Sequence, residues 1–536
     1  MALIGSIVKV GSLTGVSRAG GFLRDILIAH ALGTGPVADA FFVAMRFPNL
    51  FRQMFAEGAF NSAFVPMFAG KLEQQGAAAA KAFAERVLAV LLFWLLLFSI
   101  AAQLAMPWLM LVIAPGFTDD PEKFGYAVQF TQVTFPYLLF MSLTALQGGI
   151  LNSLHRFGAP AAAPILLNVV MAGALICVVP FTGRPGLVLS WSVAASGLCQ
   201  FLWLVFSCNR AGMALWLPMP RLDPEIKRLL KLMLPGLLSG GVTQINIVVG
   251  TIIATSFPAA VSYLYYADRV FQLPLGVIGA AVGVVLLPTL TRSLRAGRHD
   301  VAMHNLNRCI EFSMSLIIPA TLALLAIPVA IMTTLFERGA FGPEASRASA
   351  WALAAFAAGL PAFALVKAFA PCFFAREDTT TPFRVAVIAV VTNIALSIAL
   401  SQTIGFIGIP IATTLATTLN ATLLGVRLWR LEHIVLDQRL KRRLPRIFAA
   451  SLGMTGILLA TTWAIDPFIA AGGWLRLIML VVLVVVGLVA YAVLGLLFGA
   501  FERADFSKAL TRRKGNGAAA QPAPAAISDA TPGGES

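Results

Sequence analysis

Charged residues are scarce in this sequence. Asp, Glu, Lys and Arg together make up 12% of the 536 residues, against about a quarter in ordinary soluble domains. Hydrophobic residues make up 59% of the chain, and no polar linker divides the apolar runs before about the last thirty residues. This shortage of charge excludes a water-soluble globular protein and predicts an all-α, polytopic membrane protein.

Acidic residues are fewer than basic ones. The chain has 24 Asp and Glu against 39 Lys and Arg, a formal net charge of +15. In a soluble protein this excess would favour a nucleic-acid partner, whereas in a membrane protein it bears first on orientation. We therefore expect membrane lipids, and no nucleic acid, as partners.

The chain lacks the cysteine pairs of a disulfide or zinc framework. Its five cysteines lie in or beside apolar stretches without a CxxC spacing, which is typical of small core residues. A cleaved signal peptide is not expected, because charged residues from Lys9 to Asp25 interrupt the apolar N-terminus and no small-x-small site follows. We expect this stretch to be retained as the first helix.

Common catalytic motifs are missing as well. The sequence contains no HExxH, GxxxxGK[ST] or GxSxG, and its five histidines are scattered mainly at loops. The predicted spans hold no carboxylate cluster of the kind that binds Mg²⁺ for phosphotransfer. We therefore predict no catalytic residue, no metal and no cofactor, and an ATP-driven pump in a single chain is disfavoured.

Windows of about 20 apolar residues predict about fourteen membrane-spanning helices. Several are longer than one bilayer crossing, as expected if they tilt or protrude. The spans lie near 6–32, 36–69, 80–114, 122–153, 159–182, 185–208, 225–256, 259–290, 304–336, 345–374, 382–402, 405–430, 444–466 and 472–500.

The distribution of Lys and Arg predicts the orientation. An even number of spans puts both termini on one side, and the connections on that side hold 27 basic residues against five on the other. The positive-inside rule then places both termini in the cytoplasm. The tail 504–536 has a basic beginning and then mostly Ala, Pro, Gly and Ser, so we expect disordered cytoplasmic chain.

An internal repeat appears at an offset of about 222 residues. The segment from Arg46 to Pro66 parallels the segment from Arg269 to Pro288. Because six spans separate the copies, both have the same orientation, which predicts two six-helix bundles related by a pseudo-two-fold axis along the membrane normal. The expected domains are 1–210, 211–435, a pair of extra helices in 436–503, and the tail 504–536.

Seven basic residues fall inside the spans, where a charge is costly and usually faces a cavity or a partner. Arg18 and Arg24 lie on a polar, small-residue face of the first span, Arg52 follows the second, and Arg269 occupies a matching place in the repeat. We predict that these four arginines converge on one cavity. Paired guanidinium donors suit phosphate oxygens, so a diphosphate head group is the natural ligand.

Pro48 should free the carbonyl of Ala44 and kink the second span.

A second interpretation treats each arginine as one half of a local ion pair. Arg18 would then pair with Asp25, Arg46 with Asp39, and Arg269 with Asp268, without binding a ligand. The sequence does not decide whether Lys367 lines the cavity. Asn246, Thr392, Asn393 and Thr413 supply polar oxygens in the second half, but the sequence identifies no coupling ion.

Three segments resemble the MurJ (MviN) lipid II flippase family of bacteria, within the multidrug/oligosaccharidyl-lipid/polysaccharide superfamily. They are SRAGGFLRD at 17–25, DAFFVAMRFPNLFRQMFAEGAFNSAFVP at 39–66 and YYADRVFQLPLGV at 265–277. The resemblance extends from the first span to the fourteenth. The Ala/Pro tail is not part of the family pattern and receives no role.

The resemblance implies a transporter, not an enzyme, in the bacterial cytoplasmic (inner) membrane. It would move lipid II, undecaprenyl diphosphate bearing the disaccharide-pentapeptide unit, from the cytoplasmic to the periplasmic leaflet by alternating access, for peptidoglycan synthesis, cell-wall biogenesis and cell shape. Proteins of cell-wall synthesis are candidate partners, and the last two helices would form a groove for the lipid tail. The resemblance assigns critical roles to Arg18, Arg24, Arg52 and Arg269, and supporting roles to Ser17, Gly21, Asp39, Asn49 and Glu57, while Pro48 and Gly21 would serve helix bending and close approach.

Other functions fit parts of the same pattern. A flippase for another lipid-linked oligosaccharide satisfies the charge argument equally well. A multidrug or cation antiporter of the same superfamily fits less well, because four arginines would repel a cationic substrate. A membrane enzyme acting on lipid diphosphates would release phosphate or UDP, and a scaffold without transport would tolerate replacement of the buried arginines.

Overall fold

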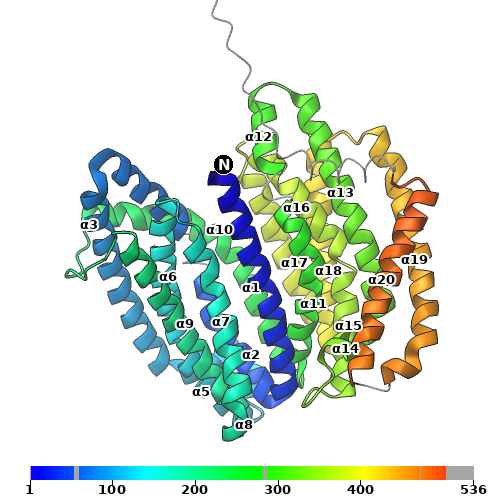
Figure 1. Cartoon of the computed structure of the whole chain (residues 1–536), viewed down its shortest axis with the longest axis horizontal. Coiled ribbons are helices and arrows are strands. Elements are labelled where there is room, and N and C mark those ends of the chain that lie inside the picture. Colours follow the sequence, from blue (N-terminus) through cyan, green and yellow to red (C-terminus); the bar gives the residue numbers. More distant parts are fainter. Residues whose placement is uncertain (1, 54–59, 282–285, 471–472, 502–536) are drawn as a thin grey trace, which may run out of the picture.

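The computed structural model describes residues 2–53, 60–281, 286–470 and 473–501. Over these residues the regular structure is helical and contains no strand, which confirms the all-α fold. Figure 1 shows the helices running mostly along one common direction, as expected for a chain that crosses a membrane repeatedly. The α-helices are α1 (Ala2–Leu32), α2 (Pro36–Phe51), α3 (Asn61–Leu104), α4 (Met106–Ile113), α5 (Pro121–Thr134), α6 (Pro136–Ser153), α7 (Gly158–Cys177), α8 (Val179–Thr182), α9 (Pro185–Arg210), α10 (Pro224–Thr255), α11 (Ala260–Ala281), α12 (Leu287–Arg295), α13 (His299–Ala326), α14 (Pro328–Phe336), α15 (Pro343–Ala357), α16 (Leu360–Phe374), α17 (Thr380–Ile404), α18 (Gly408–Arg430), α19 (Gln438–Ala470) and α20 (Gly473–Leu497).

The predicted spans agree with these helices, although several spans are broken. The breaks before α4, α6, α8, α14 and α16 each have a proline in the first turn of the helix that follows. Proline suits that position because the N–H groups of the first turn have no acceptor within the helix, so the N–H that proline lacks is not needed there. The break in α3 has another cause, since Gly76 adopts a φ of 82° there.

Nine helical segments of the described chain are long and apolar enough to cross a membrane. One of them combines α17 and α18, so the nine account for ten of the predicted spans. The remaining four correspond to α1, α2, α10 and α11, which carry most of the charges found inside spans. Because a charge in lipid is costly, these four helices are expected to turn their charged faces away from lipid.

The chain divides into a first half (α1–α9), a second half (α10–α18) and an extra pair (α19, α20). Figure 1 shows α3, α6 and α9 at one side, α13 to α18 at the other, α1 between them, and the extra pair at the far edge of the second half. Positions related by the repeat meet where the halves touch. Asp39 accepts a hydrogen bond of 2.9 Å from the backbone N–H of Ser262, and the rings of Phe42 and Tyr265 stack at 3.9 Å. These contacts place α2 and α11 near the axis that relates the repeats.

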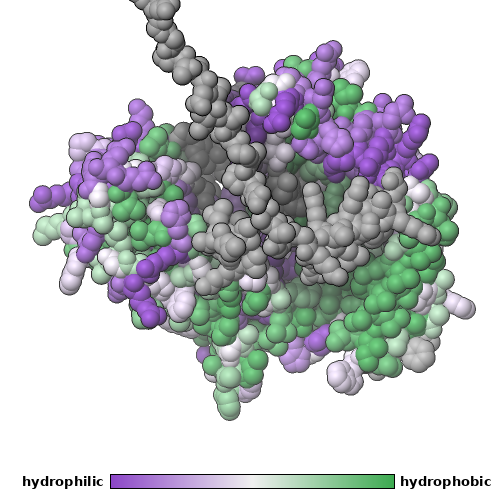
Figure 2. Space-filling model, turned by 45° about the horizontal axis from the view of Figure 1, so that its top comes forward, coloured by the Kyte–Doolittle hydropathy of each residue, from purple (hydrophilic) through white to green (hydrophobic). Residues whose placement is uncertain are grey.

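The two ends of the molecule differ in charge. The basic end holds the start of α1, the end of α20 and the connections that precede α7, α10 and α19 (Figure 1). Hydrophilic residues gather at this end in Figure 2, whereas the flank formed by the extra pair is strongly hydrophobic. The opposite end holds the turns that precede α5, α9 and α15.

Prolines inside the helices leave carbonyls without a helical donor, and neighbouring helices supply replacements. Pro48 leaves the carbonyl of Ala44 free, as predicted, and the hydroxyl of Thr134 donates to it at 3.1 Å. The helix α2 continues through Pro48 and ends at Phe51. Such replacements allow proline within membrane helices, where water cannot satisfy the backbone.

Candidate substrate site between the two halves

Asp25 joins two of the four predicted arginines. Arg24, its neighbour on α1, donates to Oδ1 from Nη2 at 2.7 Å and from Nε at 3.1 Å. Arg269 on α11 lies with its Nε 3.3 Å from Oδ2, and Tyr265 donates its hydroxyl to Oδ1 at 3.1 Å. The carboxylate is buried, so it offsets one of two guanidinium charges that come from opposite halves of the chain. One net positive charge remains in this group.

Arg269 also lies over an aromatic ring. Its guanidinium carbon is 4.6 Å from the centroid of the Tyr265 ring, a cation–π contact. The Arg269 side chain is 32% exposed, whereas that of Arg24 is 6% exposed. Arg269 is therefore the more accessible of the two arginines that share Asp25.

The second edge of Arg24 faces α7. Nη1 of Arg24 donates to Oδ1 of Asn168 at 3.1 Å, and Nδ2 of Asn168 donates to the carbonyl of Ser17 at 2.8 Å. Asn168 was not among the residues predicted from the sequence. One signal could have found it, because it is the single amide in an otherwise apolar helix. The predicted Ser17 contributes to this contact through its backbone.

Arg18 lies one and a half turns before Arg24 and is exposed. Its guanidinium lies against Gly276 of α11, which directs it toward the second half. Lys367 of α16 is also exposed and close enough to Arg18 for their charges to interact. Charged side chains at this depth face a water-accessible space. Lys367 of the second half therefore lies near Arg18 of the first half, which the sequence left open.

Arg52 belongs to a different contact, at the end of α2. Its Nε donates to Oδ1 of Asn49 at 2.8 Å, so the predicted Asn49 orients this arginine. The next residue, Gln53, accepts a hydrogen bond of 2.7 Å from Gln244 of α10, which links the two halves. The predicted Glu57 lies outside the described residues.

Asp39 lies nearer to the opposite end of the molecule. It is fully buried and accepts hydrogen bonds from Nζ of Lys123 at 2.7 Å and from the hydroxyl of Ser262. Ser262 precedes Arg269 by seven residues on α11, which corresponds to about 10 Å along the helix. The structure therefore does not bring the Asp39 carboxylate into the group formed by Asp25, Arg24 and Arg269.

Two of the local ion pairs weighed from the sequence, Arg18 with Asp25 and Arg46 with Asp39, are wrong. Asp25 pairs with Arg24 and Arg269, and Asp39 pairs with Lys123. Arg46 donates to the hydroxyl of Thr251 on α10 at 2.5 Å. The reason is geometric. Long side chains reach residues on neighbouring helices, and periodicity along a single helix does not show which helices are neighbours.

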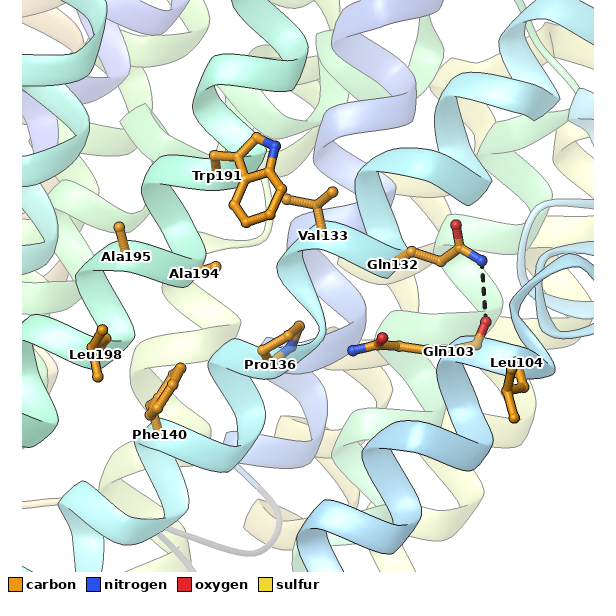
Figure 3. Close-up of a pocket in the computed structure, with 10 residues that line it drawn as sticks. All are labelled: Gln103, Leu104, Gln132, Val133, Pro136, Phe140, Trp191, Ala194, Ala195 and Leu198. Carbon is orange, nitrogen blue, oxygen red and sulfur yellow. Dashed lines mark hydrogen bonds between the residues drawn. The ribbon is translucent and has the colours of Figure 1, made fainter.

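A separate pocket of about 710 Å³ opens on the flank of the first half. Figure 3 shows it between the end of α3, the break between α5 and α6, and α9. Pro107 leaves the carbonyl of Gln103 without a helical donor, and Nε2 of Gln132 donates to it at 3.1 Å. The remaining wall is apolar and includes Trp191 and Phe140. This pocket contains none of the charged residues described above.

Over the described ranges, no group of three or more His, Cys, Asp or Glu residues is suited to a metal ion.

Comparison with known proteins agrees with this architecture. The family model "Lipid II flippase MurJ" matches residues 28–484. The "Probable lipid II flippase MurJ" of Rhizobium tropici is 44% identical over 539 residues, covering 99% of this chain and 100% of that protein. A solved structure of "Lipid II flippase MurJ, inward closed conformation" has a TM-score of 0.77 at 23% identity, covering 92% of this chain and 98% of that one.

The fold is shared more widely. An inward-facing multidrug resistance MATE family transporter of the MOP superfamily has a TM-score of 0.63 at 15% identity, covering 80% of this chain and 99% of that one. At that identity the similarity concerns the fold alone. The family match and the Rhizobium tropici relative, by contrast, extend over most of the sequence, and they show that this chain belongs to the lipid II flippase MurJ family.

Proposed function

We propose that this protein is a lipid II flippase, a transporter that moves the undecaprenyl-diphosphate-linked peptidoglycan precursor from the cytoplasmic to the periplasmic leaflet. The observation that carries the proposal is the meeting of Arg24 and Arg269, from opposite halves, on one buried carboxylate. An arginine pair with one net positive charge suits a diphosphate, whose oxygens accept from planar guanidinium donors.

Alternating access provides the mechanism. The diphosphate enters between the halves and takes up donors of Arg24, Arg269 and Arg18, while the polyprenyl chain stays in lipid beside the extra pair. Binding changes the balance of charge at Asp25, which bridges the halves, and this favours their rocking about the bound head group. An inside-negative membrane potential contributes about 2.3 kcal/mol per charge per 100 mV toward outward movement of an anion. No covalent step is required.

Release requires the opposite end to separate. Contacts between the halves there include a hydrogen bond of 3.0 Å from the N–H of Ala340 to the carbonyl of His30, and one of 3.1 Å from Tyr266 to the carbonyl of Gly33. Asp39, Lys123 and Ser262 form a further link between the halves, so we assign Asp39 to this closure as well as to the resemblance-derived substrate role. Pro48 and Gly21 remain proposed sites of helix adjustment.

The membrane orientation follows from charge. The basic end faces the cytoplasm, in keeping with the positive-inside rule, and both termini lie there. The membrane is the bacterial cytoplasmic (inner) membrane, where the substrate is made and used. Proteins of cell-wall synthesis are the proposed partners.

The test is accessibility of lipid II to an externally added enzyme that cleaves its head group. Cells depleted of this protein should accumulate lipid II that the enzyme does not reach, and Arg24→Ala or Arg269→Ala should not restore access. Unchanged accessibility after depletion would favour a flippase for another lipid-linked oligosaccharide or an antiporter. Release of phosphate or UDP by the purified protein would favour an enzyme.

A further inference from the structure

Asn168 uses both polar atoms of its buried side chain to connect α7 with two points on α1. Its Oδ1 accepts from Arg24, and its Nδ2 donates to the Ser17 carbonyl about two turns earlier on α1. We propose that Asn168 is a positioning residue, which holds the Arg24 guanidinium in the orientation that binds the anionic head group. The proposal rests on the substrate-binding role proposed for Arg24.

The orientation of the Asn168 amide follows from its neighbours. Arg24 offers only donors, and the Ser17 carbonyl offers only acceptor lone pairs. The reversed amide would oppose donor to donor and acceptor to acceptor, so one orientation alone satisfies both contacts. The amide is therefore fixed by the backbone of α1, and it fixes the guanidinium in turn.

This arrangement leaves part of the guanidinium available. An arginine side chain has about five N–H donors, and within the described chain Asp25 and Asn168 take up one each at Nε, Nη2 and Nη1. Two contacts on different edges define the plane of the group. The second N–H of each terminal nitrogen can then meet phosphate oxygens without a search among rotamers, which lowers the entropy cost of binding.

The glycine pair of α1 gives Asn168 the room it needs. A Cβ at Gly20 would lie 3.5 Å from Nδ2 of Asn168, and a Cβ at Gly21 would lie 3.6 Å from its Oδ1. A methyl group would therefore still fit, whereas larger side chains would displace the amide. This contact gives the predicted Gly21 a specific role in the close approach of α1 and α7.

The second half contains the corresponding contact without an arginine. Asn393 on α17 donates from Nδ2 to Oδ1 of Asn246 on α10 at 2.6 Å. Asn246 is 222 residues after Arg24, and Asn393 is 225 residues after Asn168, so both pairs occupy matching places in the repeat. A polar contact between these helices is thus common to both halves, and the first half uses it to orient a cation.

The experiment measures lipid II binding to the purified full-length protein, together with its melting temperature, for five variants. Asn168→Leu keeps the approximate shape and removes both hydrogen bonds, so it should weaken binding about tenfold. Asn168→Gln keeps an acceptor for Arg24 and should retain more binding than Asn168→Leu. Arg24→Ala should weaken binding most, and Asn168→Leu should add nothing to it in the double variant.

Asn307→Leu is the matched control, because Asn307 is a buried amide on α13 that donates to the Val435 carbonyl at 2.8 Å. It should lower the melting temperature without changing binding. Normal binding by Asn168→Leu, equal loss in Asn168→Leu and Asn168→Gln, or an additive effect with Arg24→Ala would each overturn the role of Asn168. Normal binding by Arg24→Ala would instead overturn the proposed function of Arg24.

Discussion

The hydroxyl of Tyr491 on α20 donates a hydrogen bond of 2.7 Å to the backbone carbonyl of Ser315 in α13. Pro319 lies four residues after Ser315 and has no N–H to offer that carbonyl. The tyrosine therefore replaces a missing helical bond and fastens the extra pair to the second half. The same replacement joins Thr134 to Ala44 and Gln132 to Gln103 in the first half.

Tyr491→Phe should destabilise the protein while leaving its substrate contacts intact. The variant leaves the Ser315 carbonyl unpaired in an apolar environment, at a cost of about 1–2 kcal/mol. The melting temperature of the purified protein should fall. Tyr126→Phe is the control, because within the described chain the Tyr126 hydroxyl bonds the exposed Glu122 carboxylate at 2.6 Å, and this change should have little effect. Equal melting temperatures for Tyr491→Phe and the unchanged protein would contradict the assignment.

The buried pair of Lys123 and Asp39 should behave as a unit. Lys123→Met leaves a fully buried carboxylate without its cation, which costs about 3–5 kcal/mol. Adding Asp39→Asn removes the uncompensated charge and should recover most of the lost thermal stability, because the amide still accepts from Ser262. The double-mutant cycle on melting temperature measures this coupling. Independent, additive losses would show that the pair does not act as proposed.

Hydropathy predicted the helices well because burial in lipid acts on every residue of a span. The prolines at 48, 107 and 319 were visible in the sequence, but the side chains that satisfy the freed carbonyls, Thr134, Gln132 and Tyr491, were not. Those partners lie on other helices, and their positions depend on how the helices pack. Pro48 is an example. It frees the Ala44 carbonyl, as predicted, but Thr134 donates to that carbonyl and α2 continues to Phe51.

The candidate site was predicted in part. Costly charges inside spans identified Arg24 and Arg269, but periodicity separated Arg24 from Asp25, because adjacent residues do not face each other on a helix. The long arginine side chain folds back and makes the contact nevertheless. Asn168 was missed because nothing in an apolar helix indicates which neighbour a single amide meets.

Asp25→Asn should lower the stability of the ligand-free protein while leaving it able to bind lipid II. The amide cannot balance Arg24 and Arg269, so the two guanidinium groups repel each other and the ligand-free protein should melt at a lower temperature. A diphosphate can replace the missing negative charge. Lipid II should therefore raise the melting temperature of Asp25→Asn by more than it raises that of the unchanged protein. A smaller rise would mean that Asp25 helps to bind lipid II and does not compete with its diphosphate for Arg24 and Arg269.

Gly276→Ala should make the protein more stable and less active. Glycine inside a helix costs about 1 kcal/mol relative to alanine, so the change favours α11. A Cβ at this position, however, would collide with the Arg18 guanidinium, which would have to leave its place between the halves. Lipid II access in the leaflet assay should fall toward the level of Arg18→Ala, and the double variant should be no worse than Arg18→Ala. Gly173→Ala is the matched control, because a Cβ there meets nothing within 4 Å and should only stabilise α7. Full transport by Gly276→Ala would show that the position of Arg18 against α11 is not needed for the substrate.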